Sequence, residues 1–190
     1  MKQPATWSEL LANQPTTVDP SHELRPLADD VVQYVEGKAE YIAVRSPEGY
    51  GEAAEETPYL LERERVGQDF SIYRVPPYLV SIPAVTREFQ DRGLESLKPV
   101  YRAIGRLLYE AANTMTVSPP MVTVRDLAVN PRTGALFYLP PLRFSAKEIS
   151  HKAAYEQWMN ASIARTFGSL LTQRTIQKLQ AEVTMGAAGP

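Results

Sequence analysis

Residues 121 to 144, MVTVRDLAVNPRTGALFYLPPLRF, contain the side chains of this chain that are best suited to chemistry. Arg125 and Asp126 stand together beside an apolar run, and Asn130 follows soon after. A carboxylate can orient a nucleophile, and carboxylate and amide oxygens can bind Mg²⁺, so this set is compatible with phosphoryl transfer. An ordinary β-hairpin explains the same residues, with Arg125 and Asp126 as a local ion pair that closes it.

Other reactive side chains are few. His22 and His151 are too few for a multi-histidine metal site. A cation site lined by Glu52, Glu55 and Glu56 competes with the simpler expectation of a solvated acidic loop. The sequence has no cysteine and no Gly-x-Ser-x-Gly, Walker or His-Glu-x-x-His motif. Thiol, serine-hydrolase, P-loop and zincin chemistry therefore have no support.

Two further groups of residues have a plainer and a more functional interpretation. The run ERER at 62–65 is either a surface for partner recognition or, as we favour, a solvated hairpin with weak cross-strand ion pairs. Trp158, Tyr155 and Phe167 are either a binding groove or, again the favoured interpretation, core residues at helical spacing.

The composition predicts a folded protein, and the lack of cysteine is consistent with a reducing compartment. Apolar residues make up 44% of the 190 residues and charged residues 22%, enough to bury a core. The net charge of −2 and the lack of a Lys/Arg block argue against nucleic acid as a partner. No apolar run reaches the roughly 18 residues that a membrane span needs. We therefore expect a cytoplasmic protein with neither a nucleic-acid nor a membrane partner.

The first half of the chain is rich in predicted strands. Thr6 and Glu9 have the spacing of a capping box and predict a short helix. Strands are expected at 31–35 and 39–45, and a hairpin at 59–75 with Gly67-Gln68 as a two-residue turn. That turn pairs Arg65 with Phe70 and Arg63 with Ile72. A short extended segment follows at 78–82.

The second half changes to a helical period. An amphipathic helix is expected at 96–114, then strands near 122–129 and 135–139. Ser145 and Glu148 predict the cap of a long helix that Gly168 interrupts. Its apolar residues recur at a spacing of four, and a last helix follows it. The defining positions are Tyr155, Met159, Ile163 and Phe167 for the long helix and Ile176, Leu179 and Val183 for the last one.

Strands that precede helices, with little alternation, predict an α+β fold: an antiparallel β-rich part followed by a mainly helical part with a short hairpin. The expected organisation is an N-terminal helix and irregular segment at 1–29 and a β-rich lobe at 30–83. A helical lobe follows at 84–184, with its hairpin at 121–140, and then a flexible tail at 185–190.

This order resembles the protein-kinase-like and aminoglycoside-phosphotransferase-like fold. DLAVNPRTGALFYLPPL (126–142) is similar to the family's metal-binding hairpin, and TVRDL (123–127) to its catalytic loop. AEYIAVRS (39–46) is similar to the strand that carries the phosphate-contacting lysine. The resemblance implies a reduced kinase-like fold, with ATP and Mg²⁺ as the family's cofactors.

The residues at the family's chemical positions are altered. With the turn NPRTG as reference, Asp126 falls at the metal-binding Asn, Pro140 at the metal-binding Asp and Met121 at the catalytic Asp. With TVRDL as reference, Asp126 is the catalytic-type Asp, and Asn130 stands one place before the metal-binding Asn. Arg45 replaces the lysine. A degenerate, pseudokinase-like site follows from either alignment.

Three hypotheses remain. The first is a non-catalytic interaction or regulatory protein with a protein partner and no cofactor. The second is a small ATP-dependent phosphotransferase that uses Asp126 and Asn130, with Arg45 contacting the nucleotide. The third is an unrelated α+β structural or binding protein. The sequence leaves the oligomeric state open.

Overall fold

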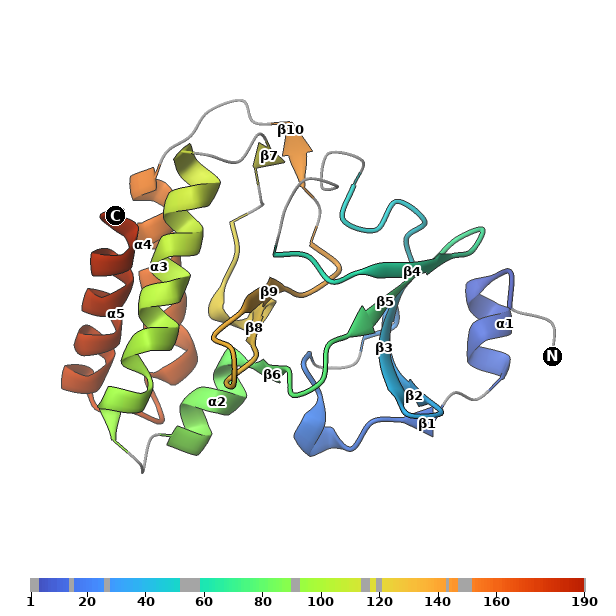
Figure 1. Cartoon of the computed structure of the whole chain (residues 1–190), viewed down its shortest axis with the longest axis horizontal. Helices are drawn as coiled ribbons and strands as arrows, with labels where there is room; N and C mark the ends of the chain where they lie inside the picture. The colour runs from blue at the N-terminus through green and yellow to red at the C-terminus, as the bar shows by residue number, and fades with distance from the viewer. Residues whose placement is uncertain are drawn as a thin grey trace.

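The computed structural model describes residues 4–13, 16–25, 28–51, 59–89, 93–113, 117–118, 121–142, 144–146 and 152–189. A five-stranded sheet stands beside a group of helices, and a small sheet lies between them (Figure 1). Both sheets are antiparallel, so the predicted α+β class is confirmed. Within the described residues, no helix is long and apolar enough to cross a membrane.

The large sheet has the strand order β1-β2-β3-β5-β4. Its strands are β1 (Thr16–Thr17), β2 (Val31–Glu36), β3 (Ala39–Val44), β4 (Arg63–Val66) and β5 (Ser71–Val75). The predicted strands at 31–35 and 39–45 therefore match β2 and β3. Their turn contains Gly37 at φ 66°, a left-handed conformation that glycine adopts without strain.

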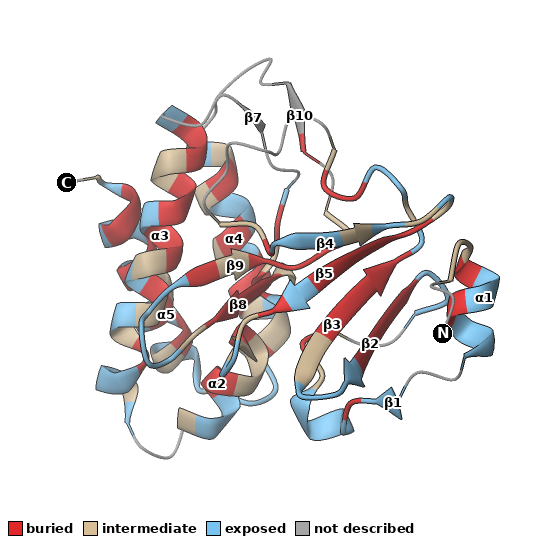
Figure 2. Cartoon of the chain, turned by 45° about the vertical axis from the view of Figure 1, so that its right-hand side comes forward, coloured by how far each residue is buried: buried red, intermediate tan, exposed pale blue. Residues whose placement is uncertain are grey.

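Each face of this sheet buries apolar side chains (Figure 2). Helix α1 (Trp7–Ala12), with the predicted Thr6–Glu9 capping box at its start, packs Trp7 and Leu10 against one face. The opposite face joins a larger core shared with the helices. This two-sided burial follows from strand geometry, because neighbouring side chains point to opposite faces.

The predicted register of the β4–β5 hairpin is wrong. Arg65 pairs with Ile72 and Arg63 with Tyr73, and the register shifts between Arg63 and Arg65. The connection is longer than two residues because Gly67 N–H bonds to the carbonyl of Phe70 (2.8 Å), whose ring is buried. The position of Asp69 in the turn is also fixed, because its Oδ1 accepts a hydrogen bond from Trp7 N (2.7 Å). The first residue of α1 thus helps to shape the turn.

A connector at 76–79 leads from β5 to the small sheet, whose order is β6-β8-β9. The strands are β6 (Val80–Ser81), β8 (Leu127–Val129) and β9 (Leu136–Tyr138). The predicted strand at 122–129 is only partly formed, because the 3-10 turn η4 (Val124–Asp126) replaces its first half. A further two-stranded sheet pairs β7 (Val117–Ser118) with β10 (Ser145–Ala146).

The helices are α2 (Ile82–Phe89), α3 (Lys98–Asn113), α4 (Lys152–Phe167) and α5 (Gln173–Ala187), with the 3-10 turn η3 (Leu94–Ser96) before α3. The predicted helices at 96–114 and around 155–167 and 176–183 are confirmed, and α4 ends just before Gly168. Ser145 lies in β10, so the predicted helix cap there is wrong; Glu148 lies outside the described residues. The expected flexible tail is wrong for 185–187, which belong to α5.

Helices α3 and α5 approach each other closely at two glycines. A Cβ atom on Gly105 would stand 2.1 Å from the carbonyl oxygen of Val183, and one on Gly186 would stand 2.1 Å from that of Arg102. Next to this crossing, Arg102 donates two hydrogen bonds to Oε2 of Glu182, at 2.9 and 2.6 Å. Gly186, in the segment expected to be a flexible tail, therefore contributes a packing contact between the two helices.

Candidate functional site

Asp126 ends η4, immediately before β8. Its Oδ2 accepts hydrogen bonds from the backbone N (2.7 Å) and the hydroxyl (2.8 Å) of Thr123. The hydroxyl of Thr123 in turn accepts a hydrogen bond from Arg125 N, and these reciprocal contacts form a capping box. This reciprocal pattern satisfies backbone groups that a tight turn leaves without partners. The local sequence TVRD therefore forms a turn, and Asp126 is part of that turn.

The other carboxylate oxygen of Asp126 is also occupied. Oδ1 forms an ion pair with Nη2 of Arg25, whose side chain is 19% exposed, against 17% for that of Asp126. The predicted ion pair between Arg125 and Asp126 is wrong. Arg125 is exposed, and Asp126 pairs with Arg25 instead. Burial lowers the pKa of the Arg25 guanidinium, and nearby Tyr50 and Asp30 oppose this effect.

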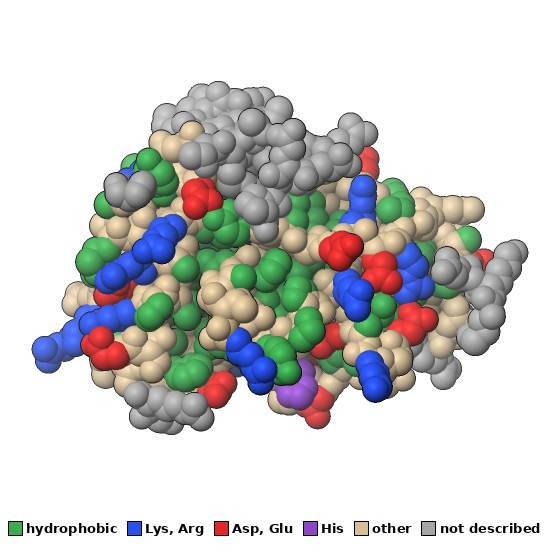
Figure 3. Space-filling model, viewed as in Figure 1, with side chains coloured by type: hydrophobic (Ala, Val, Ile, Leu, Met, Phe, Trp, Pro, Cys, Tyr) green, Lys and Arg blue, Asp and Glu red, His purple; other side chains and the backbone are tan. Residues whose placement is uncertain are grey.

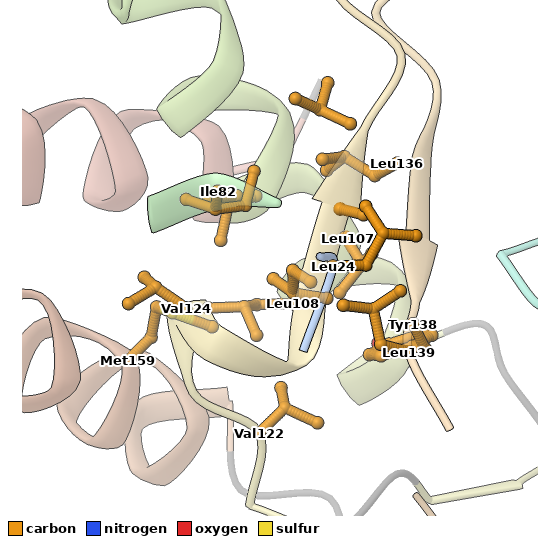
Figure 4. Packing of buried hydrophobic residues seen from close by; sticks show 14 of the residues in the cluster. Leu24, Ile82, Leu107, Leu108, Val122, Val124, Leu136, Tyr138, Leu139 and Met159 are labelled. Carbon is orange, nitrogen blue, oxygen red and sulfur yellow. The ribbon is translucent and has the colours of Figure 1, made fainter. Parts of the chain in front are cut away.

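Arg25 belongs to a segment, residues 18–25, that runs between the large sheet and the hairpin. It contains the 3-10 turn η1 (Pro20–His22). Leu24 is only 4% exposed and shares the core with the hairpin and α3 (Figure 4). We call residues 18–25 the wedge segment.

Gln33 fastens the wedge segment to the sheet. This side chain on β2 is buried; its Oε1 accepts from Leu24 N (2.8 Å) and its Nε2 donates to the carbonyl of His22 (3.3 Å). Its Nε2 also bonds to Glu40 on β3. The wedge segment is therefore bound to β2 on one side and to Asp126 on the other.

Asn130 follows β8 and shapes the hairpin turn. Its Oδ1 accepts from Arg132 N (3.0 Å), and its Nδ2 donates to the carbonyl of Pro77 in the connector (3.2 Å). The guanidinium of Arg132 stacks on the ring of Tyr78, 3.5 Å from the centroid. Tyr78 has φ 64°, which is strained for a residue with a side chain. Asn130 thus joins the hairpin to the connector.

Asp126 and Asn130 stand at opposite ends of β8. Extended backbone rises about 3.3 Å per residue, which puts their Cα atoms roughly 13 Å apart. Mg²⁺ needs ligand oxygens at about 2.1 Å, so two short side chains at this separation do not meet on one ion. In the described part of the chain, no three His, Asp or Glu side chains are grouped in a way that would hold a metal.

The remaining predicted positions are spread over the molecule. Arg45 follows β3 with an exposed side chain, and its N–H bonds to the carbonyl of Asp30 (2.8 Å). Met121 is 48% exposed. Pro140 is buried and is joined to Pro141 by a cis peptide bond.

The structure places the residues of the two groups with alternative interpretations. Tyr155 and Phe167 are core residues as favoured, but Trp158 is 40% exposed. In the ERER run, Arg65 pairs with Glu36 of β2 at 2.7 Å. Charged side chains of both signs are spread over the face seen in Figure 3. His151, Glu52, Glu55 and Glu56 lie outside the described residues.

Two cavities, each of about 300 Å³, lie beside the wedge segment. The first is bordered by His22, Glu40 and the connector residues Tyr78 and Leu79. The second, which we call the arginine pocket, has a basic lining. Its walls are formed by Pro20, Glu23, Leu24, Arg25, Ser81, Pro83, Arg87 and Arg125.

Of the three arginines in the arginine pocket, the sequence motifs identified only Arg125. Arg25 and Arg87 come from a turn-rich segment and a short helix, and no local pattern distinguishes them from other surface arginines. Their convergence depends on the packing of the wedge segment and α2 against η4.

Comparison with models of known protein families finds no match for this chain, and comparison with curated proteins finds none either.

Proposed function

We propose that this chain is a non-catalytic interaction or regulatory protein on a degenerate kinase-like scaffold. The observation that carries the proposal is the state of Asp126, the residue expected to act in catalysis. Arg25 occupies one of its carboxylate oxygens, and Thr123 donates twice to the other. A carboxylate engaged in this way stabilises the fold and is poorly placed to accept a proton from a substrate.

The order of elements supports the scaffold part of the proposal. An antiparallel sheet leads through the connector at 76–79, the short strand β6 and helix α2 to the long helix α3, and the β8–β9 hairpin follows. This is the order on which the resemblance rests. The wedge segment lies between the sheet and the hairpin, which is where a site shared by the two parts would be built.

The geometry of the hairpin supports the non-catalytic part. Asp126 and Asn130 stand too far apart to share one ion, and the side chain of Asn130 is bonded to Arg132 and Pro77. A protein that does not turn over a substrate acts through the contacts it makes, so the partner we propose is another protein.

The proposal is tested by thermal unfolding with ATP and Mg²⁺, together with an assay for loss of the γ-phosphate. The wild-type chain is expected to show neither a Mg²⁺-dependent rise in Tm nor turnover, because a ligand that binds the native state must stabilise it. Asp126→Asn and the exposed control Asp29→Asn are compared, each against its own Tm without nucleotide. A Mg²⁺-dependent rise or phosphate release that Asp126→Asn abolishes and Asp29→Asn retains would establish the phosphotransferase alternative.

A further inference from the structure

The arginine pocket brings together cations from three separate parts of the chain. Arg25 lies in the wedge segment, Arg87 in the last turn of α2 and Arg125 in η4. Like charges repel, so their convergence in one cavity has a cost unless anions offset it. Such convergence is typical of sites that receive an anion from outside the chain.

The carboxylates nearby offset these charges only in part. Asp126 pairs with Arg25, and Glu23 is the acidic residue in the lining. Neither Arg87 nor Arg125 forms an ion pair with another described residue. Both side chains are exposed and are therefore free to turn toward a ligand.

Two donors of the lining also lack acceptors. Nε of Arg25 is buried and has no hydrogen-bond partner among the described residues. The buried hydroxyl of Ser81 accepts from Ala84 N (3.3 Å), but no described residue accepts its own hydrogen. A buried donor without a partner destabilises a fold, and an oxyanion bound here would accept from it and relieve that loss.

We propose that the arginine pocket binds a phosphate group, either the free ion or the head of a small phosphate monoester. Guanidinium groups match the oxygens of phosphate in charge and geometry, and several of them favour a dianion over a single carboxylate. The cavity, at about 300 Å³, is at the lower end of the range for small-molecule sites. Pro20, Leu24 and Pro83 supply apolar walls for the body of an ester.

This site needs neither a divalent metal nor a free carboxylate, so it stands apart from the proposed function. Binding is measured by calorimetry and thermal unfolding with inorganic phosphate and, in a second arm, with glycerol phosphate. EDTA is present in both arms, so that Mg²⁺-dependent nucleotide chemistry does not contribute. Chloride at equal ionic strength serves as the reference, because non-specific screening acts on any charged surface.

The variants are Arg87→Gln, Arg125→Gln and their combination. Neither residue takes part in the Arg25–Asp126 pair, so the fold is expected to persist. The double variant should raise the Kd for the bound probe by about tenfold or more, because it removes two charge-assisted contacts. Arg165→Gln, at an exposed arginine on α4, makes the same change in net charge as either single variant and should leave the Kd unchanged.

Saturable binding of either probe that depends on Arg87 and Arg125 supports the site. Tighter binding of inorganic phosphate identifies the free ion as the ligand, and tighter binding of glycerol phosphate identifies a phosphate monoester. The proposal is overturned if neither probe binds beyond the chloride reference. It is equally overturned if the double variant and Arg165→Gln behave alike.

Discussion

Removing the charges of the Arg25–Asp126 pair should lower the free energy of unfolding, because this ion pair fixes the wedge segment against the hairpin. Arg25→Met keeps the apolar stem of the side chain and removes the guanidinium. Asp126→Asn keeps a side-chain oxygen that accepts from Thr123 and removes the charge. In either single variant, one charged partner stays behind in a partly buried place, where its hydration is incomplete.

The expected size of the effect follows from burial. Removing one partner of a fully buried pair costs about 3–5 kcal/mol. The two side chains are 19% and 17% exposed, so water screens them in part and about 2–3 kcal/mol is expected for each single variant. The double variant leaves no orphaned charge and should cost about as much as one single variant. The coupling energy in the double-mutant cycle is then roughly 2 kcal/mol.

Urea unfolding, followed by circular dichroism, measures each free energy of unfolding without adding salt. Arg125→Met is the matched control, because this neighbouring arginine is exposed and makes no ion pair with another described residue; it should cost less than about 0.5 kcal/mol. A coupling below about 0.5 kcal/mol would refute the reasoning. So would a loss in Arg125→Met equal to that in Arg25→Met.

Three further predictions concern other parts of the molecule. Burial raises the pKa of Tyr34 to about 12 and that of Tyr138 well above its ordinary value of 10.0. The neutral phenols therefore contribute their full stability below pH about 10, and this stability is lost as the pH rises through about 12. Phenolate absorbance should appear over the same pH range in which the circular dichroism of the fold is lost. Gly105→Ala and Gly186→Ala should each lower the free energy of unfolding by about 2 kcal/mol, despite a gain of about 1 kcal/mol in helix propensity, because the new methyl groups meet backbone atoms. Gly134→Ala, which has open space but a positive φ, should cost only about 1 kcal/mol in the same urea measurement, and an equal loss in all three would contradict the packing argument. Asn130→Ala should cost about 1 kcal/mol and speed amide hydrogen exchange at 130–134. Asn113→Ala is the control, because the side chain of Asn113 bonds to the carbonyl of Tyr109 in its own helix, and it should not change exchange at 130–134.

Much of the fold could be predicted from the sequence because its signals are local. The spacing of Tyr155, Met159, Ile163 and Phe167 places them on one helix face, and all four are buried in α4. The β-branched and aromatic content of β2 and β3 and the capping box at Thr6 are local signals too, and they predict the two strands and the first helix. These features depend on residues a few positions apart, which a pattern can capture.

The errors arose where distant segments decide the local structure. The β4–β5 turn is shaped by the burial of Phe70 and by the bond from Trp7 to Asp69. Helix α5 continues to Ala187 because Gly186 packs against Arg102 of α3. A tail of glycine and alanine has no helical periodicity, so only the partner helix could have indicated this.

The candidate site was predicted in part. The sequence predicted a hairpin in this stretch, and Asp126 and Asn130 are both fixed by specific contacts in it. It did not indicate that Arg25 pairs with Asp126, since these residues are 101 positions apart. Nor did it indicate the arginine pocket, which exists only once the wedge segment and α2 have packed.

The same long separation has a consequence for the order of folding. A contact that closes a loop of 101 residues carries a large entropic cost until both ends are already in place. The wedge segment should therefore dock after the sheet, the hairpin and α3 have assembled, and its contacts should be absent from the folding transition state. Arg25→Met is then expected to accelerate unfolding by most of its effect on stability while the folding rate hardly changes, so this pair governs how long the native state lasts.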